Sequence, residues 1–383
     1  MTGAHLHEVY PTLSYQPVTG EGVFLEDASG RRVLDLYGGH AVAGLGYGHP
    51  RLTEAVVAQA QKLLFQSNAV TMRIRDEAAD KLAAFAPTGL ERVFFVNSGA
   101  EANENALRLA LQATGRGKIV AMEHAFHGRT AAAGALSWNS RDRWYGFPQV
   151  PFDIEFVPRN DEAALASAVD NDTAAIIIEP VQGVAGAFDF DPSFMQATRR
   201  ISDEAGALLI LDEVQTGVGR LGQPFGADYF GITPDLLTTA KALGGGFPCG
   251  AVIMRNELAT ELRPGALGST FGGAPLACAA IVAVLDTIAE NHLLAQVTEV
   301  SAQISETCVV GPITAIQGVG FLLGLRTTPR AALVRNALLE RDILAGTSGD
   351  PHILRLLPAL ILQSEHVESL AEALKEIGDA TLQ

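Results

Sequence analysis

Short runs of consecutive apolar residues alternate with helical patterns along the middle of the chain. The sequence 174-AAIIIEP-180 is an example, because it is apolar at consecutive positions, whereas a half-exposed strand alternates apolar and polar residues. Such runs predict strands that are covered on both faces, in a mostly parallel sheet with crossover helices. The runs that fit this pattern are residues 92–96, 118–122, 174–180, 207–214, 235–240 and 250–254.

Both ends of the chain show the pattern of a smaller α+β unit. Residues 275–306 read as one long helix or two, and strand candidates follow at 317–326 and 352–360. Residues 22–39 predict a hairpin that turns at a Ser-Gly pair and packs with the C-terminal unit. We therefore predict a large central domain and a small domain built from both termini. The predicted bounds are 46–285 for the large domain, and 1–45 with 286–383 for the small one.

The composition limits the classes of function. A chain of 383 residues exceeds what one hydrophobic core usually organises, which favours two domains. A formal net charge of −16 argues against nucleic acid or an anionic membrane as a partner. No apolar run approaches the ~18 residues that span a bilayer, and the N-terminus lacks the layout of a signal peptide. We therefore predict a cytoplasmic protein.

The cysteines and histidines give no framework for a disulfide or a metal. Cys249, Cys278 and Cys308 are far apart and odd in number, which fits a reducing compartment. His124 and His127 have a spacing that metal ligands can show, but no second cluster of ligands accompanies them. We therefore predict no metal site.

Lys241 stands apart from the other lysines of the chain. It follows the apolar run 235–240 and precedes a glycine-rich turn, so that small and apolar residues flank it on both sides. Loss of hydration in such a place lowers the pKa of the amine and makes it nucleophilic near neutral pH. Taken alone, the same residues fit a surface lysine at the start of a helix equally well.

Two acidic residues come at the ends of apolar runs. Glu179 falls at the end of one run and Asp212 at the end of another, with Gln215 three positions beyond Asp212. In open parallel sheets, ligands gather beyond the carboxyl ends of the strands. We therefore expect both carboxylates to point at the same crevice.

Residues 92–111, RVFFVNSGAEANENALRLAL, predict a strand, a tight turn and a helix. Asn97 and Ser98 can cap the helix, and Gly99 permits a close approach of the backbone. The free amides of the first helical turn form an anion site that suits a phosphate. An ordinary strand-to-helix turn has the same features, so this signal is weak on its own.

Together these parts match the needs of one cofactor, pyridoxal phosphate. It requires a lysine for an imine, a cradle for its phosphate, and a carboxylate beside its pyridine nitrogen. Asp212 suits the nitrogen, because a nearby opposite charge raises the pKa of a cationic group. The cationic ring then stabilises the substrate carbanion. Phe126 offers an aromatic face for stacking on the ring.

The chain resembles the class III aminotransferases of pyridoxal-phosphate fold type I over essentially its whole length. The matching stretches are NSGAEANENALRLA, HAFHGRT, EPVQG, LILDEVQTGVGRLG, TAKALGGGFPCGAV, GSTFGGAPLACA and LRLLPAL. In this order they are highly specific, and within the class they look most like the acetylornithine aminotransferases. The resemblance implies an α/β fold with two parts. A large domain has a mostly parallel sheet flanked by helices, and a smaller α+β domain is built from both termini.

The resemblance also implies roles at the cofactor. Lys241 forms the imine and moves the proton between substrate and cofactor, so that it and Asp212 are the catalytic residues. Asp212 pairs with the pyridine nitrogen, and Gln215 hydrogen-bonds the ring hydroxyl. Val214 and Phe126 pack on the two faces of the ring. The amides of Ser98, Gly99 and Ala100 hold the phosphate, and Glu179 and Thr270 complete the implied cofactor-binding set.

For the substrate, the resemblance points to two arginines. Arg355 resembles the residue that binds the α-carboxylate of glutamate or 2-oxoglutarate, and Arg129 resembles the one that binds the distal carboxylate. A guanidinium fork suits planar carboxylates, although each arginine could instead form a surface salt bridge. Ser269 is implied to lie near the substrate. Thr270 is implied to bind the phosphate of the neighbouring subunit, which makes the functional unit a homodimer with shared sites.

Two positions depart from the family pattern. Val184 stands where the family usually has a glutamate, which pairs with the arginine matching Arg355 when an ω-amino donor is bound. An apolar side chain cannot mask that charge, so either another group covers Arg355 or ω-amino donors bind less well than α-amino acids. Ala274 stands where asparagine is commoner, and we derive no consequence from it.

The predicted reaction is transfer of the δ-amino group of N2-acetylornithine to 2-oxoglutarate by a ping-pong route, as in arginine biosynthesis. Alternatives in the class are N-succinylornithine, carrier-linked aminoadipate or lysine, ornithine or 4-aminobutyrate as substrate, and an α-amino acid exchange that Val184 favours. A mutase or decarboxylase on this fold shares Lys241 and Asp212. A nicotinamide dehydrogenase is disfavoured, because NSGAEANEN is not GxGxxG. A non-enzymatic cofactor-binding protein predicts a damaged set of catalytic residues, and this set is intact.

Overall fold

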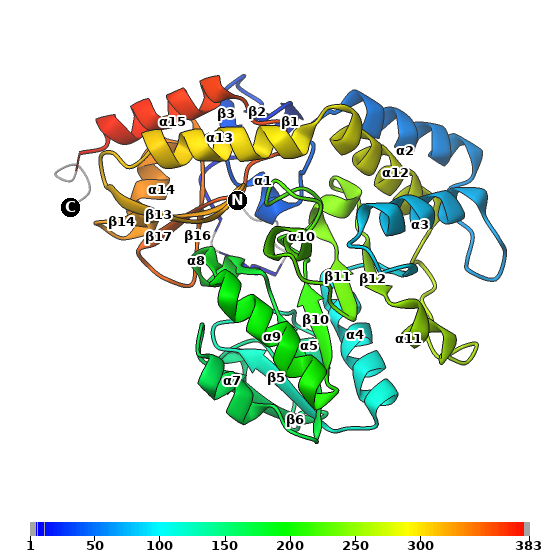
Figure 1. Ribbon diagram of the computed structural model, residues 1–383. Helices are drawn as coiled ribbons and strands as arrows, with labels where there is room; N and C mark the ends of the chain where they lie inside the picture. Colours follow the sequence, from blue (N-terminus) through cyan, green and yellow to red (C-terminus); the bar gives the residue numbers. More distant parts are fainter. Residues whose placement is uncertain (1–4, 6, 11, 379–383) are drawn as a thin grey trace.

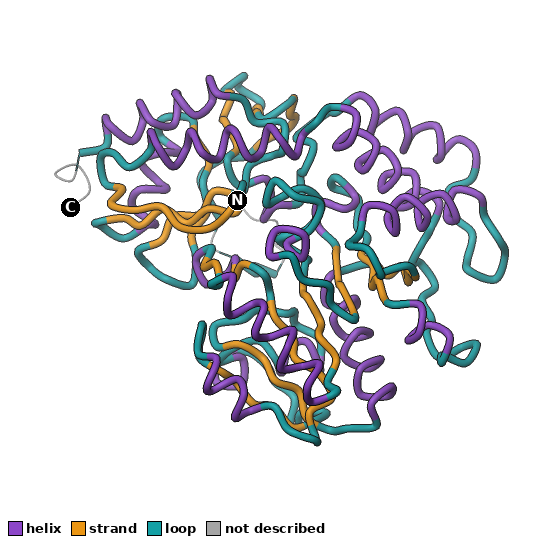
Figure 2. Tube along the Cα trace, in the orientation of Figure 1, coloured by secondary structure: helices purple, strands orange, loops and turns teal. Residues whose placement is uncertain are grey.

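The computed structural model describes residues 5, 7–10 and 12–378 and contains one large sheet and two four-stranded sheets (Figure 1). The remaining residues belong to the ends of the predicted small domain and lie outside the described ones. Figure 2 shows the strands of the smaller sheets gathered on one side of the molecule, apart from those of the large sheet.

The large sheet has the strand order β4-β12-β11-β10-β7-β5-β6. Neighbouring strands from β11 to β6 are parallel, whereas β12 runs antiparallel to β11 and β4. Every residue of β7 is buried, as the apolar run predicts. The strands are β4 (Arg92–Val96), β5 (Lys118–Met122), β6 (Asp153–Val157), β7 (Thr173–Ile178), β10 (Leu208–Asp212), β11 (Leu236–Thr239) and β12 (Gly250–Met254).

The strand β6 is not among the predicted strands. Its residues alternate between exposed and more buried positions, because it forms the edge of the sheet beside β5. An edge strand therefore lacks the continuous apolar run that marks the central strands. The predicted strands 174–180 and 207–214 also end early, at Ile178 and Asp212, so Glu179 lies in the loop after its strand.

Helices cover both faces of the large sheet. The helix α4 (Gly99–Thr114) shares a core with Ile177, whereas α9 (Pro192–Ala205) shares a core with the preceding residue, Ile176. Successive side chains of a strand point to opposite faces, so a strand covered on both faces is apolar at every position. The other helices of this region are α5 (Ala131–Ala135), α6 (Ser140–Arg143), α7 (Glu162–Ala168), α8 (Gly183–Gly186), α10 (Gly226–Phe230) and α11 (Asn256–Thr260).

The two ends of the chain meet in one of the smaller sheets. The strands β2 (Phe24–Asp27) and β3 (Arg32–Asp35) form the antiparallel hairpin that residues 22–39 predict. The strand β3 also pairs in parallel with β15 (Ile343–Leu344), so the N-terminal hairpin packs with the C-terminal unit. The sheet is completed by β1 (Pro17–Glu21).

The other smaller sheet differs from its prediction. Residues 317–326 belong to two antiparallel strands, β13 (Ile313–Val319) and β14 (Leu322–Thr327), and not to one. Gly320 in the turn has φ 56, which a glycine adopts without strain. The candidate 352–360 is a strand only at β17 (Ile353–Leu356). The remaining strands are β16 (Gly346–Thr347) in this sheet and the separate pair β8 (Val181–Gln182) and β9 (Phe188–Asp189).

Residues 275–306 form two helices, α12 (Pro275–Glu290) and α13 (Leu293–Thr307), which are bent by 67°. Residue 285, a predicted domain boundary, lies inside α12, and the division into domains stays a prediction. No single helix in the described part of the chain is long and apolar enough to cross a membrane. The bent pair, taken together, meets the criteria of length and composition alone. The other helices are α1 (Gly38–Ala41), α2 (Pro50–Lys62), α3 (Arg73–Phe85), α14 (Ala331–Leu339) and α15 (Ser364–Glu376).

Candidate active site

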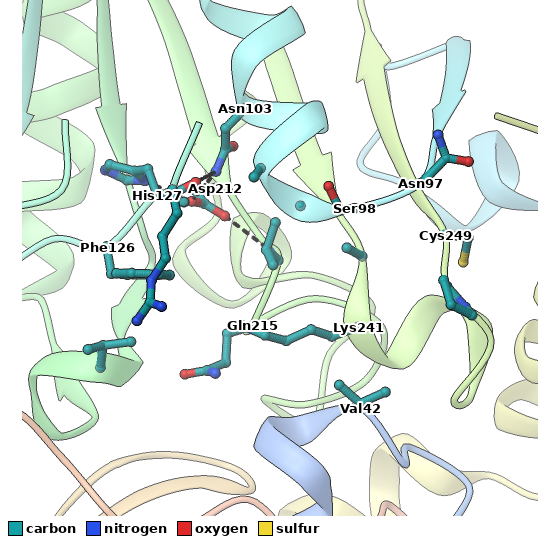
Figure 3. A pocket seen from close by; sticks show the side chains of 18 of the residues that line it. Val42, Asn97, Ser98, Asn103, Phe126, His127, Asp212, Gln215, Lys241 and Cys249 are labelled. Atoms are coloured by element: carbon teal, nitrogen blue, oxygen red, sulfur yellow. Dashed lines mark hydrogen bonds and ion pairs between the residues drawn. The ribbon is translucent and has the colours of Figure 1, made fainter. Parts of the chain in front are cut away.

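A cavity of about 450 Å³ lies at the carboxyl ends of the central strands (Figure 3). Its walls come from the loops after β4, β5, β7, β10 and β11, and from the loop before the antiparallel β12. Ser269, Thr270 and Arg355 are not among its lining residues. The other sequence-predicted residues line it together: Ser98, Gly99, Ala100, Phe126, Arg129, Glu179, Asp212, Val214, Gln215 and Lys241, with Val184.

Lys241 enters the cavity from the end of β11, at the first residue of a 3₁₀ turn, η1 (Lys241–Gly244). Its backbone has φ 46, a left-handed conformation that costs a residue with a side chain about 1–2 kcal/mol. Burial lowers the pKa of Lys241 to about 8, although the charges of Asp212 and Glu179 act in the opposite direction. A substantial part of the amine is therefore neutral, and nucleophilic, near physiological pH.

Asp212 is the last residue of β10 and is almost fully buried. One carboxylate oxygen, Oδ2, accepts hydrogen bonds from Asn103 Nδ2 and His127 Nδ1, each at 2.7 Å. The other, Oδ1, accepts from the backbone N–H of Val214 at 3.1 Å. A carboxylate oxygen can only accept from the imidazole, so His127 carries its proton on Nδ1. These three donors fix the direction of the carboxylate and offset part of its desolvation.

Asn103 and His127 are the residues of this network to which the sequence assigns no role. Asn103 Nδ2 also donates to the carbonyl of His127 at 2.7 Å, and its Oδ1 accepts from the Thr238 hydroxyl at 2.6 Å. Both residues stand inside motifs of the family resemblance, NSGAEANENALRLA and HAFHGRT. Their position in these motifs was the only feature of the sequence that could have identified them as site residues. The spacing of His127 from His124 suggested only a metal site.

The start of α4 forms an anion cradle. The side chain of Ser98 caps the helix by accepting from the amide of Glu101 at 3.2 Å. Among the described residues nothing accepts a hydrogen bond from the amides of Gly99 and Ala100, which begin the helix beside the cavity. A Cβ at Gly99 would lie 2.6 Å from Val214 Cγ1, so only glycine lets the helix start approach this wall. Free amides at the positive end of the helix dipole suit a phosphate.

Glu179 is a buried carboxylate on the same side as Phe126. Its Oε1 accepts from the backbone N–H of Phe126 at 2.9 Å, which positions the Phe126 ring at the wall of the cavity. Burial raises the pKa of Glu179 to about 7, helped by the negative charge of Asp212 and opposed by His127 and Lys241. Glu179 therefore holds Phe126 and also adds to the charge balance around Lys241.

Gln215 has a buried amide oxygen that no described residue donates to. A Cβ at Gly183 would lie only 1.6 Å from this oxygen, so the glycine leaves room for Gln215 against the cavity wall. An unpaired buried acceptor is costly, so it indicates that a donor from a ligand completes it.

These groups fit pyridoxal phosphate. The α4 amides suit the phosphate, the anchored Asp212 suits a protonated ring nitrogen, and the unpaired oxygen of Gln215 suits the ring hydroxyl. Phe126 and Val214 supply the aromatic and aliphatic walls that a flat ring requires. Lys241 supplies an amine with a lowered pKa for the covalent attachment.

Arg129 is exposed at the rim of the cavity between two aromatic rings. Its guanidinium carbon lies 5.7 Å from the ring centre of Tyr10 and 5.5 Å from that of Trp144. These two cation–π contacts orient the guanidinium while leaving its charge without a carboxylate partner among the described residues.

Arg355, on β17, is buried behind the cavity. Its guanidinium donates to the carbonyl oxygens of Thr347 at 2.7 Å and Gly183 at 3.0 Å, and to the Tyr37 hydroxyl at 2.9 Å. No carboxylate in residues 12–378 forms an ion pair with it, and burial lowers the pKa of Arg355. The three groups that accept hydrogen bonds from this arginine are therefore neutral. Val184 contributes none of them.

Ser269 and Thr270 lie in the loop before α12, beyond the cavity wall. Ser269 accepts from Asn97 Nδ2 at 3.3 Å, which joins this loop to the start of α4. Thr270 is exposed. The structure of a single chain therefore brings Ser269 toward the anion cradle but does not bring Thr270 into its own cavity.

The histidines with metal-like spacing do not come together. His127 is buried against Asp212, whereas His124 is exposed beside Trp138, with ring centres 5.7 Å apart. Within the described part of the chain, no group of three or more His, Cys, Asp or Glu side chains is arranged to hold a metal ion.

Comparisons with known proteins agree with this geometry. The family model described as "Aminotransferase class-III" matches residues 7–377. The acetylornithine aminotransferase of Streptomyces coelicolor is 43% identical over 97% of this chain and 92% of its own length, and that of Methanosarcina mazei is 39% identical over 96% and 93%. The ornithine aminotransferase of Toxoplasma gondii, whose structure was described with partial occupancy of PLP at its active site, is 28% identical. The structural match covers 98% of this chain and 92% of the Toxoplasma gondii chain, with a TM-score of 0.92.

The family match spans nearly the whole chain, and the cavity holds the lysine, carboxylate and anion cradle that the cofactor of this family requires. The resemblance inferred from the motifs is confirmed, together with the α/β fold of type I and its mostly parallel sheet. The chain belongs to the class III aminotransferases and is a pyridoxal-phosphate-dependent transaminase.

Proposed function

We propose that this protein transfers the δ-amino group of N2-acetylornithine to 2-oxoglutarate in two alternating half-reactions. The observation that carries the proposal is the identity of 39–43% to two acetylornithine aminotransferases over nearly the full length of the chain. The presence of two arginines without carboxylate partners near one cavity supports it, because 2-oxoglutarate has two carboxylates to bind.

In this proposal Lys241 performs the proton transfer. When bound, pyridoxal phosphate supplies an electron-withdrawing ring that stabilises negative charge on the substrate carbon. The amine of Lys241, whose pKa burial lowers to about 8, would hold the cofactor and would accept and return the proton at the reacting carbon of the substrate. Asp212 would keep the pyridine nitrogen protonated, and the hydrogen bonds from Asn103 and His127 hold the Asp212 carboxylate in place for that role.

The two arginines divide the recognition of the dicarboxylate between them. Arg355 binds the carboxylate next to the reacting carbon, and Arg129 binds the distal one. The stacking of Arg129 between Tyr10 and Trp144 supports this role, because an oriented guanidinium loses little freedom when it binds a carboxylate.

We also propose a homodimer in which the partner supplies Thr270 to the phosphate. Phe65 and Phe271 form an exposed apolar patch next to Thr270, with Phe271 62% exposed, and Leu64 and Val70, from the same loop as Phe65, are exposed as well. The Phe65 and Phe271 rings are 5.1 Å apart, which makes the patch continuous between two loops. Exposed apolar patches of this kind mark protein interfaces, and one beside Thr270 supports a partner at that place. The cytoplasmic location stays a prediction from the sequence.

The function is tested by separate half-reactions. Protein loaded with pyridoxal phosphate is mixed with one amino donor at a time, and loss of the cofactor's visible absorbance is followed. N2-acetylornithine and glutamate should each convert the cofactor to its amine form, while ornithine, N-succinylornithine and 4-aminobutyrate should react with lower kcat/KM. Conversion by glutamate but not by N2-acetylornithine would refute the proposed donor while leaving the aminotransferase class intact.

The lowered pKa of Lys241 predicts how capture of the cofactor depends on pH. Covalent capture needs the neutral amine, whose fraction falls about tenfold per pH unit below the pKa. The rate at which cofactor-free protein takes up pyridoxal phosphate should therefore rise about tenfold from pH 6 to 7 and level off above about 8. Stopped-flow absorbance measures the rate, with Lys241→Arg as the control that captures none. A rate still rising steeply from pH 9 to 10 contradicts the lowered pKa.

The dimer is tested by placing a charge in the patch. Phe271→Glu should weaken self-association at least about tenfold, because burying an unpaired carboxylate in an interface is costly. Light scattering after gel filtration should show monomers, and activity should fall with the loss of Thr270 from the partner's site. The matched control is Tyr229→Glu, which changes another exposed aromatic residue and should leave the dimer intact. A wild-type monomer with full activity refutes the shared site.

A further inference from the structure

One of the groups that cover Arg355, the Tyr37 hydroxyl, belongs to the residue just before a strained turn in the N-terminal part of the chain. Four consecutive residues of α1, Gly38 to Ala41, have positive φ of 55, 56, 65 and 67. His40 and Ala41 are not glycines, and each adopts this left-handed conformation at a cost of about 1–2 kcal/mol. Asp35 holds the start of the turn, since its Oδ1 accepts from the amides of Tyr37 at 2.7 Å and Gly38 at 2.9 Å. Strain that the surroundings maintain in this way commonly marks a functional position.

The strained turn brings the imidazole of His40 against the hydroxyl of Tyr37. The atoms Nδ1 and Oη are 2.7 Å apart, and the two ring centres are 4.8 Å apart. The Tyr37 oxygen already accepts a hydrogen bond from Arg355 Nη2 at 2.9 Å. An arginine can only donate, so the single hydroxyl proton of Tyr37 is free to point at His40. We assign the hydrogen bonds to one direction, from Arg355 to Tyr37 to His40, with Nδ1 of His40 as the acceptor.

This direction requires a neutral histidine with an unprotonated Nδ1. Burial, together with the positive charges of Arg355 and Lys241, lowers the pKa of His40 to about 4, although the residue remains exposed in part. A hydroxyl that donates to an acceptor becomes a better acceptor itself, so the neutral His40 strengthens the bond between Tyr37 and Arg355. His40 therefore acts on Arg355 through Tyr37 and does not contact it.

A substrate carboxylate that binds Arg355 has to displace the groups that cover it, and the charge of these groups decides how easily this happens. Arg355 is satisfied by one hydroxyl and two backbone carbonyls, which belong to Tyr37, Gly183 and Thr347. A carboxylate adds the attraction of a full opposite charge to its hydrogen bonds with a guanidinium, which a neutral hydroxyl or carbonyl does not supply. A substrate carboxylate consequently displaces a hydroxyl from Arg355 more easily than it would displace a carboxylate side chain.

We propose that Tyr37 and His40 form a neutral gate on Arg355, which covers the guanidinium while an ω-amino donor reacts and yields it to the α-carboxylate of the dicarboxylate. Tyr37 is the gate itself and His40 is its positioning residue. The gate fills the role that Val184 cannot fill, and it rests on the proposed pairing of an ω-amino donor with a dicarboxylate.

The position of His40 extends this arrangement toward the second arginine. Its ring centre is 5.7 Å from that of Tyr10, and the Arg129 guanidinium stacks on the same Tyr10 ring at 5.7 Å. His40 thus contacts both Tyr37, the neighbour of Arg355, and Tyr10, the neighbour of Arg129. The gate and the proposed site for the distal carboxylate are therefore adjacent.

The test compares the two half-reactions in Tyr37→Phe, His40→Ala and His40→Asn. Without the hydroxyl, Arg355 keeps only two backbone carbonyls and attracts the wrong end of the donor, so kcat for N2-acetylornithine should fall about tenfold with a parallel fall in KM, as non-productive binding requires. The half-reaction with glutamate should be unchanged or faster, because no hydroxyl has to be displaced. His40→Ala should show a smaller shift of the same sign. His40→Asn, which keeps an acceptor near Nδ1, should recover most of the wild-type ratio.

A binding measurement keeps the gate testable without turnover. Calorimetry with glutarate, an unreactive dicarboxylate, should show severalfold tighter binding to Tyr37→Phe than to the wild type, since the carboxylate no longer competes with a hydroxyl. Adding Val184→Glu to Tyr37→Phe restores a cover, now charged, and should weaken glutarate binding. The matched control is Tyr145→Phe, which removes a hydroxyl bonded to the Ala131 carbonyl at 2.7 Å and should change neither ratio nor affinity.

Two results would overturn the gate. Equal losses in both half-reactions for Tyr37→Phe mean that Tyr37 only supports the fold or the cofactor. Unchanged glutarate affinity in that variant means that the hydroxyl does not compete for Arg355. If the wild-type protein does not react with N2-acetylornithine, the proposed donor is wrong. The glutarate measurement then still decides whether the Tyr37 hydroxyl competes with a carboxylate for Arg355.

Discussion

The site depends on a buried carboxylate at the end of a central strand. Asp212 is only 3% exposed, and a carboxylate in such a place is costly unless donors and a positive charge compensate it. Asn103, His127 and the amide of Val214 supply the donors. The positive charge comes from the amine of Lys241 and, when pyridoxal phosphate is bound, from its ring nitrogen. The carboxylate whose burial is costly is therefore the one that would make a bound cofactor reactive.

The sheet topology explains why these groups meet. The strands β10 and β11 are parallel neighbours, with Asp212 paired to Thr238, so the residues that follow both strands emerge at the same edge. Thr238 also binds Asn103, which joins α4 and its anion cradle to the same pair of strands. The pairing of β3 with β15 ties the N-terminal hairpin to the C-terminal part of the chain, and Tyr37, which follows β3, then contacts Arg355 on β17.

Local sequence could predict what local patterns encode. The central strands were predictable because both faces are covered, whereas the edge strand β6 alternates and shows no apolar run. Lys241 and Asp212 could be inferred because each follows an apolar run. The cover of Arg355 could not, because Tyr37 is 318 positions away and reaches it only through tertiary contacts. The absence of a glutamate at Val184 left open whether another group covers Arg355 or ω-amino donors bind less well, and in the structure neutral groups contact Arg355.

The assignment of Lys241 as the covalent anchor is tested most directly by trapping. Protein loaded with pyridoxal phosphate is reduced with borohydride and digested, and the peptide that carries the pyridoxyl group is mapped by mass spectrometry. We predict a single labelled site, at Lys241, whose amine has a lowered pKa and lies in the same cavity as Asp212. A label on Lys62, Lys81, Lys118 or Lys375, or no label on protein that still binds the cofactor, would contradict the assignment.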